Sequence, residues 1–151
     1  MERIRRSIDV LVIGGGVSGC SCTVQAARSG ATVALIEESP WIGGMITAAG
    51  VSAFDGNKKA IASGFFLEFR RALEDHFGGA EAVKTGWISD TCFTPKVAHE
   101  ILTGLVEASG AEIFRESKIR SISKKGQRIT GAVVEHDDVE VTFEAKVVVE
   151  A

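Results

Sequence analysis

The sequence predicts an α/β fold built around a parallel β-sheet, and three features near its N-terminus carry that prediction. A short apolar run, Asp9 to Ile13, is typical of a buried strand. Residues Val17 to Ser29 then have the pattern of a helix that ends at Gly30. A second apolar run, Ala31 to Ile36, predicts another strand. Strand, helix and strand in this order form a β-α-β unit, whose two strands lie parallel in one sheet.

The turn between the first strand and the helix has the spacing G-x-G-x-x-G, with Gly14, Gly16 and Gly19 at the glycine positions. Gly14 permits a tight turn, Gly16 lets a pyrophosphate approach the backbone, and Gly19 lets the helix pack closely on the strand. Glu37 follows at the tip of the second strand, where its carboxylate can accept hydrogen bonds from a ribose diol. Together these features predict a dinucleotide site, and a glycine-rich turn without a ligand is the weaker alternative.

Size and composition are those of one globular domain. The chain has 151 residues, of which 45% are apolar and 25% charged, and its net charge is −3. This charge gives no reason to expect nucleic acid or an anionic membrane as a partner. The basic start, Met1 to Arg6, precedes an apolar run that is too short and too rich in glycine for a signal peptide.

Cysteine usage predicts a reducing, cytoplasmic location, because an odd number of cysteines argues against a disulfide framework. Cys20 and Cys22 are two positions apart on the predicted helix and point in different directions, so we expect packing residues, not a joint metal or redox site. Cys92 lies before a helix, and an ordinary loop thiol is favoured over a ligand contact. The three histidines, His76, His99 and His136, have no spacing typical of a zinc site or a catalytic triad.

The middle of the chain predicts two helices and a third parallel strand. Apolar residues recur every four positions from Lys59 to Phe77, so this helix buries an aromatic stripe in the core. Thr94 and Pro95 have the pattern of an N-cap and first helical residue, and that helix ends at Gly110. The strand predicted next is Ala111 to Phe114.

The last third predicts an antiparallel meander, with strands at Ile119 to Ser123, Arg128 to Glu135 and Val139 to Phe143. Val147 to Val149 is a continuous apolar run, which predicts a further strand buried on both faces. The sequence stops directly after it. We therefore expect residues 1–151 to be one domain from the N-terminal part of a longer polypeptide or of a two-part protein.

These elements resemble the FAD-binding half of the glutathione-reductase-type flavoproteins. A long segment separates Glu37 from the third parallel strand, and a meander stands where a nicotinamide domain has a helix. The closer resemblance is to the bacterial FAD-dependent oxidoreductases, and it covers nearly the whole chain. The stretches that carry it are Gly43-Gly44-Met45-Ile46-Thr47, Gly64-Phe65-Phe66, Cys92-Phe93-Thr94-Pro95 and Gly131-Ala132-Val133-Val134. It implies a Rossmann-like, three-layer FAD/NAD(P)-binding domain in which the meander forms the crossover.

The resemblance also implies FAD as cofactor and a role for each site residue. The pyrophosphate would lie on the glycine-rich turn and first helical turn, Gly14, Gly16, Val17, Ser18 and Gly19. Glu37 would hold the adenosine ribose, with Glu38 and Ser39 near the adenine. Ile119 would offer backbone hydrogen bonds to adenine. The residues expected along the pyrophosphate, ribityl chain or isoalloxazine edge are Gly43, Gly44, Met45 and Thr47.

The expected function is that of a flavin-dependent oxidoreductase, in which hydride passes from a small-molecule substrate to the flavin. No residue of the chain is predicted to be a catalytic acid or base, and the substrate is unknown. The family's Thr-Gly-Asp-Gly-Asp-like turn and substrate domain do not occur in residues 1–151. One alternative is therefore a non-catalytic nucleotide-binding fragment or subunit that self-associates or needs a partner chain. The other is an NAD(P)-dependent enzyme.

Overall fold

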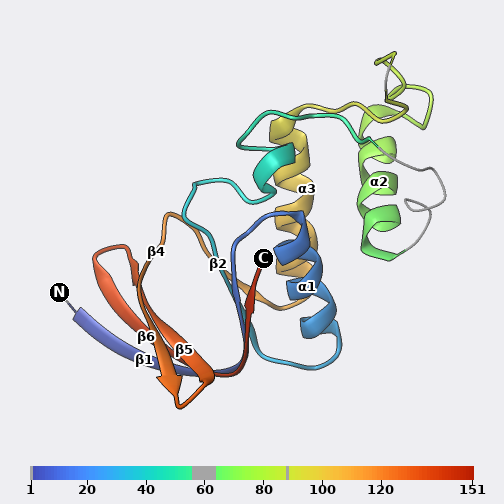
Figure 1. Cartoon of the computed structure of the whole chain (residues 1–151). Coiled ribbons are helices and arrows are strands. Elements are labelled where there is room, and N and C mark those ends of the chain that lie inside the picture. Colours follow the sequence, from blue (N-terminus) through green and yellow to red (C-terminus); the bar gives the residue numbers. More distant parts are fainter. Residues whose placement is uncertain (1, 56–63, 88) are drawn as a thin grey trace.

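A computed structural model describes residues 2–55, 64–87 and 89–151 (Figure 1). Within them, three α-helices and a short 3-10 helix accompany a single six-stranded sheet. No helix of this described part is long and apolar enough to cross a membrane. In chain order the elements are β1 (Glu2–Ile13), α1 (Val17–Arg28), β2 (Val33–Ile36), η1 (Gly44–Ile46), α2 (Gly64–Phe77), α3 (Pro95–Ala108), β3 (Glu112–Phe114), β4 (Lys118–Lys125), β5 (Arg128–His136) and β6 (Val139–Glu150).

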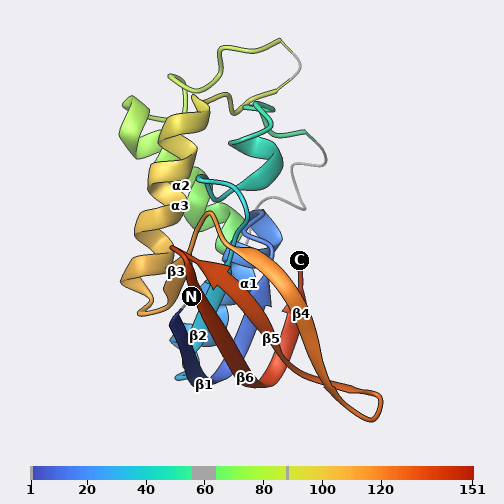
Figure 2. The ribbon, with the colours of Figure 1, turned by 90° about the vertical axis from the view of Figure 1, so that its left-hand side faces the viewer.

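The sheet combines a parallel half with an antiparallel half. Its strand order is β3-β2-β1-β6-β5-β4. The first four strands of this order are parallel, whereas β5 pairs antiparallel with both β6 and β4. The three α-helices lie on one side of the parallel strands (Figure 1), and the meander strands curl across the front when the molecule is turned (Figure 2). The predicted α/β class, the parallel sheet and the antiparallel meander are confirmed.

Alternate residues of the parallel strands face two separate hydrophobic cores. Val12 and Leu35 pack with residues of α1, α2 and α3, Leu102 among them, in the larger core. Leu11 and Ile36 point the other way, into a smaller core completed by the inner faces of β5 and β6. The layers are therefore helices, parallel strands and the curled meander. This alternation follows from the period of two along a strand.

The first strand is longer than the sequence predicts. We expected it to begin at Asp9, but β1 begins at Glu2 and pairs with β6 over nearly its whole length. Its exposed first half is mostly charged, so it lacks the apolar pattern that predicts a strand. Those charges meet acidic partners on β6, with Arg3 Nε 3.1 Å from Glu140 and Arg5 3.9 Å from Glu144.

The prediction for Val147 to Val149 is wrong in two respects. These residues continue the last meander strand, since β6 runs unbroken from Val139 to Glu150. They are also not buried on both faces, because Val147 is 52% exposed. The pairing explains this: β5 accompanies β6 only as far as Glu144, and beyond it β6 has β1 as its strand partner.

The helix predictions hold within the described residues. Phe65, Phe69 and Leu73 of α2 are buried, as the aromatic stripe predicted. The predicted start of that helix at Lys59 lies outside the described residues. Thr94 occupies the N-cap position of α3, although its side chain makes no capping hydrogen bond.

Cys20 and Cys22 have the packing role expected of them. Cys20 is fully buried in the helix-side core, and Cys22 is partly buried against the same core. Neither forms a disulfide, and Cys92 is also a free thiol.

Candidate functional site

The glycine-rich turn leads from the end of β1 into α1, and two of its glycines are required by packing inside the chain. Gly14 has a φ of +105°, which strains any residue with a side chain. A Cβ at Gly14 would also collide with the backbone carbonyl of Ala151, and one at Gly19 would collide with the carbonyl of Gly14. The turn and the close helix–strand contact predicted for these two positions are therefore present.

Gly16 differs, because no described residue requires a glycine there. Its φ of −63° suits any residue, and an added Cβ would meet no atom of the described residues within 4 Å. Gly16 is the N-cap of α1, yet no side chain caps this helix and its first turn holds no acidic residue. The first amides of a helix lack intrahelical partners, and here the first helical bond comes from Cys20 to the Gly16 carbonyl. The N-terminus of α1 is thus open to an anion.

Glu37 extends β2 and is bound to the turn beside it. The Gly15 amide donates a hydrogen bond of 2.8 Å to Oε2 of Glu37, and the Ser39 amide donates one of 2.7 Å to Oε1. We expected a ribose to supply the donors that satisfy this carboxylate, but the backbone already supplies two. An ionised carboxylate has about four acceptor sites, so both oxygens keep capacity for ligand hydroxyls.

The glycine pair packs directly on the glycine-rich turn. The Gly43 amide donates a 2.7 Å hydrogen bond to the Gly15 carbonyl, and Gly43 forms a bridge with Gly16. Gly43 has a φ of +109°, and a Cβ on Gly44 would come within 3.2 Å of the Gly16 Cα. The structure therefore brings together the two glycine segments that the sequence places far apart.

Other predicted contact residues around this loop have different surroundings. Thr47 is buried and its hydroxyl donates to the Ile42 carbonyl at 2.8 Å, so this side chain closes the loop. The Ser39 hydroxyl donates to the Trp41 carbonyl. Met45 is 69% exposed, and in the first turn of α1 Ser18 is exposed and Val17 is half-buried. Ligand contacts for these residues stay predictions.

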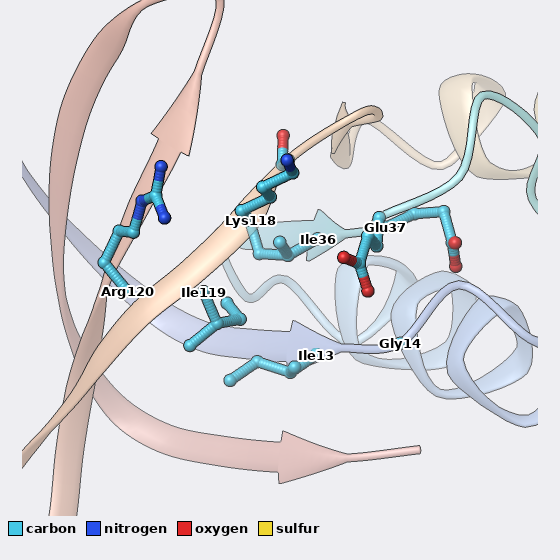
Figure 3. Close-up of a pocket in the computed structure, with 9 residues that line it drawn as sticks. Ile13, Gly14, Ile36, Glu37, Lys118, Ile119 and Arg120 are labelled. Carbon is cyan, nitrogen blue, oxygen red and sulfur yellow. The ribbon is translucent and has the colours of Figure 1, made fainter.

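A cavity of about 460 Å³ adjoins the turn at the carboxyl ends of β1 and β2. Figure 3 shows Ile13 on β1 and Ile119 on β4 among the lining residues, and the Glu37 carboxylate is bonded to the glycine-rich turn. Arg120 belongs to the lining, but its guanidinium is paired with Glu135 at 2.8 Å. The full lining is Ile13, Gly14, Ile36, Glu37, Glu38, Ser117, Lys118, Ile119 and Arg120.

The sequence identified only part of this cavity. Gly14, Glu37, Glu38 and Ile119 were predicted as binding residues, and the structure places all four in one lining. The walls formed by Ile13 and other residues were missed. The last apolar residue of each predicted parallel strand could have been identified from its position, because ligands bind outside the carboxyl ends of parallel strands.

The geometry suits an elongated ligand with an anionic middle. The cavity has apolar walls and an acidic end, which match a nucleoside, and Gly14 connects it to the open N-terminus of α1. A Cβ at Gly16 would enter the space beside that N-terminus. FAD has this shape and charge distribution, so the residues present fit it. Within the described residues, no group of three or more His, Cys, Asp or Glu side chains could hold a metal ion.

Comparison with known proteins gives the same picture. The model of the family described as FAD dependent oxidoreductase matches residues 9–151. A digeranylgeranylglycerophospholipid reductase from Picrophilus torridus is 27% identical over 95% of the chain, and a thiamine thiazole synthase from Pyrococcus horikoshii is 29% identical over 95%. The chain spans 38% and 56% of the lengths of these two relatives.

Solved structures share the fold. A geranylgeranyl bacteriochlorophyll reductase-like protein from Thermoplasma acidophilum matches 98% of the chain with a TM-score of 0.67 and 21% identity, and the match covers 40% of that protein. L-proline dehydrogenase from P. horikoshii matches 100% of the chain with a TM-score of 0.58 and 24% identity, covering 23% of that protein. At these identities the likeness concerns the fold alone.

Proposed function

The chain belongs to the FAD dependent oxidoreductase family, and from this premise we propose that it binds FAD along the edge of the sheet where β1 and β2 end. In an intact flavoenzyme it would serve as the cofactor domain for oxidation or reduction of a small organic molecule. One observation supports this most. No side chain caps the N-terminus of α1, and the space beside the adjoining Gly16 is not filled by any described residue. The Glu37-lined cavity begins beside it.

The diphosphate would lie at the N-terminus of α1. Its charge would be balanced by the helix dipole and by amide donors, without a lysine or arginine. Gly16 would let the phosphate oxygens reach the backbone, and Gly44, packed on Gly16, would line the other side. A side chain at Gly16 would occupy this space, whereas one at Gly44 would press against the Gly16 backbone.

The adenosine would lie in the cavity. Glu37 would use its remaining acceptor sites for the ribose hydroxyls while keeping its bonds to Gly15 and Ser39. Ile13 and Ile119, both in the lining of the cavity, would provide apolar contacts to the adenine. The cavity walls would thus exclude water from the base.

When bound, FAD supplies the centre that accepts or donates a hydride. The chain's own residues bind and orient this cofactor, and the Gly43–Gly44 segment would fix the direction in which the flavin leaves the diphosphate site. The groups that bind the substrate and catalyse its reaction would then be supplied by protein outside the described residues.

Direct titration tests the proposal. FAD added to the chain should show a saturable change in flavin fluorescence, from which its Kd is obtained. NAD⁺ and NADP⁺ serve as competitors. Displacement of FAD by a nicotinamide cofactor at equal concentration, or no binding of FAD, would overturn the proposal.

A second candidate is a binding module that acts only with a partner chain. Three large apolar side chains, those of Met45, Val51 and Trp87, are 69%, 50% and 99% exposed. Where exposed apolar side chains form a continuous patch, they can mark a site of protein contact. Turnover of an artificial electron acceptor by the chain alone would favour the complete enzyme over the module.

A further inference from the structure

Trp41 and Ile42, which precede the glycine pair, rest against one side chain of α3, that of His99. The His99 ring stacks on the Trp41 indole, with centroids 5.2 Å apart and planes 7° from parallel. The Ile42 amide donates a hydrogen bond of 3.2 Å to Nδ1 of His99, and the Ile42 side chain is fully buried. A helix outside the glycine-rich turn therefore holds the residue just before Gly43.

The next amide along the chain is held from the opposite side. Gly43 donates its 2.7 Å hydrogen bond to the Gly15 carbonyl of the glycine-rich turn. The peptide at positions 42 and 43 is thus clamped between α3 and that turn. Because Gly43 has a φ of +109°, which residues with a side chain rarely adopt, and forms the bridge with Gly16, a small shift at Ile42 would separate the two glycine segments.

The clamp requires an unprotonated Nδ1 on His99. A protonated nitrogen is a donor and would oppose the Ile42 amide. The Ile42 carbonyl lies 3.4 Å from the same nitrogen and already accepts the Thr47 hydroxyl, so a protonated Nδ1 would have to share that oxygen with Thr47 over a longer distance than the present bond. The neutral ring therefore fits this position better than the charged one.

The surroundings of His99 favour the neutral ring. Burial lowers the pKa of His99, and the positive charge of Arg115, from the segment after β3, acts in the same direction. The Ile42 backbone and Glu100, on α3 itself, act in the opposite direction. The loop from Ser39 to Thr47 contributes no titratable side chain.

We propose that His99 is a positioning residue for the cofactor site, which in its neutral form sets the Gly43–Gly44 segment against the glycine-rich turn, so that its protonation weakens FAD binding. The identity of the ligand rests on the proposed function. The clamp itself belongs to the ligand-free chain, and His99 acts through Ile42 without touching the ligand.

Two variants separate the parts of this role. His99→Asn places an uncharged acceptor near the position of Nδ1, and His99→Phe keeps a ring for Trp41 but offers no acceptor. His76→Asn, at the exposed end of α2, is the matched control for loss of a histidine. All are compared with the parent chain from about pH 8 to about pH 5, across the range in which histidine titrates.

The first readout needs no cofactor. Amide exchange measured by NMR should show Ile42 and Gly43 losing protection in the parent and in His76→Asn as His99 becomes protonated. His99→Asn should keep protection at both pH values, and His99→Phe should lack it at both. Loss of protection at low pH in His99→Asn, or full protection in His99→Phe, would overturn the proposal.

The second readout is the Kd for FAD. We expect a rise of roughly fivefold on acidification in the parent, the size of one neutral hydrogen bond. The same rise should occur in His76→Asn, with no pH dependence in His99→Asn. A pH dependence in His99→Asn equal to the parent's would overturn the proposal. If the parent binds no FAD at pH 8, the proposed function fails, and the exchange measurement still decides the role of His99.

Discussion

The Gly15 amide donates a 2.8 Å hydrogen bond to Oε2 of Glu37, so the tip of β2 holds in place the turn that follows β1. The second carboxylate oxygen accepts the Ser39 amide at 2.7 Å. Glu37 therefore orders both the glycine-rich turn and the start of the next loop before any ligand binds. This double role makes its replacement informative.

Replacing Glu37 by alanine should weaken FAD binding and lower the melting temperature together. The loss in binding should be roughly 1.5–3 kcal/mol, the range for hydrogen bonds to a charged group. Stability should fall because the Gly15 and Ser39 amides lose their acceptor. Calorimetry with riboflavin, which lacks the adenosine, is the control: equal weakening of riboflavin and FAD would contradict a ribose role. Glu37→Gln, which keeps one acceptor oxygen, should be intermediate.

Replacing Gly16 by valine should abolish FAD binding while leaving the fold intact. Within the part of the chain that the structure describes, an added Cβ meets no atom within 4 Å, but it enters the space assigned to the diphosphate. Thermal unfolding and flavin titration measure the two effects. Gly19→Val is the contrasting variant, because its Cβ would collide with the Gly14 carbonyl and should destabilise the fold itself. Parent-like FAD affinity in Gly16→Val would show that the diphosphate lies elsewhere.

Cys20 should resist alkylation at about pH 8, a pH at which an ordinary thiol is partly ionised. Burial raises the pKa of Cys20 to about 12, with the Glu37 charge acting in the same direction, so the reactive thiolate is scarce. Cys92 is only partly buried and serves as the internal reference. Peptide mass spectrometry after timed iodoacetamide treatment should show Cys92 modified first. Equal rates at the two residues would mean that the helix-side core opens readily.

The chain alone should self-associate as its concentration rises. Met45, Val51 and Trp87 leave apolar surface exposed, and burying it favours contact between copies. Sedimentation velocity over a range of concentrations measures this. Trp87→Asp, at a side chain that is 99% exposed, should shift the equilibrium toward monomer without loss of melting temperature. A strictly monomeric preparation at all concentrations would contradict the expectation.

The elements that rest on local signals were predicted well. The β-α-β unit depends on neighbouring residues, with an apolar strand, glycines in the turn and Gly30 after the helix, and all are present in the structure. The helix that begins at Pro95 also follows its local pattern. These predictions succeeded because each signal lies within, or directly beside, the element that it defines.

The failures concern residues whose environment is set by distant parts of the chain. Arg3 and Arg5 do not resemble a strand, yet they pair with Glu140 and Glu144 of β6. Val147 resembles a buried residue, but its exposure depends on where β5 stops. No pattern near either site records these partners.

The candidate site divides in the same way. Glu37 was identified by its position after a strand, whereas its bonds to Gly15 and Ser39 depend on how the turn and loop fold around it. His99 gave no signal, because a single histidine on a helix forms no motif. Only the folded chain shows that it meets Ile42.

The pairing of β1 with β6 has a consequence for how the chain folds. Glu2 pairs with Val139 and Ile13 with Glu150, while β2 accompanies only Val10 to Ile13 of β1. The first half of β1 thus has no strand partner until the ribosome has made β6. Contacts so distant in sequence slow folding, because a long loop must close before they form. During synthesis the first half of β1 therefore stays unpaired until β6 has been made. The emerging chain exposes this strand edge, which is the kind of surface that chaperones bind.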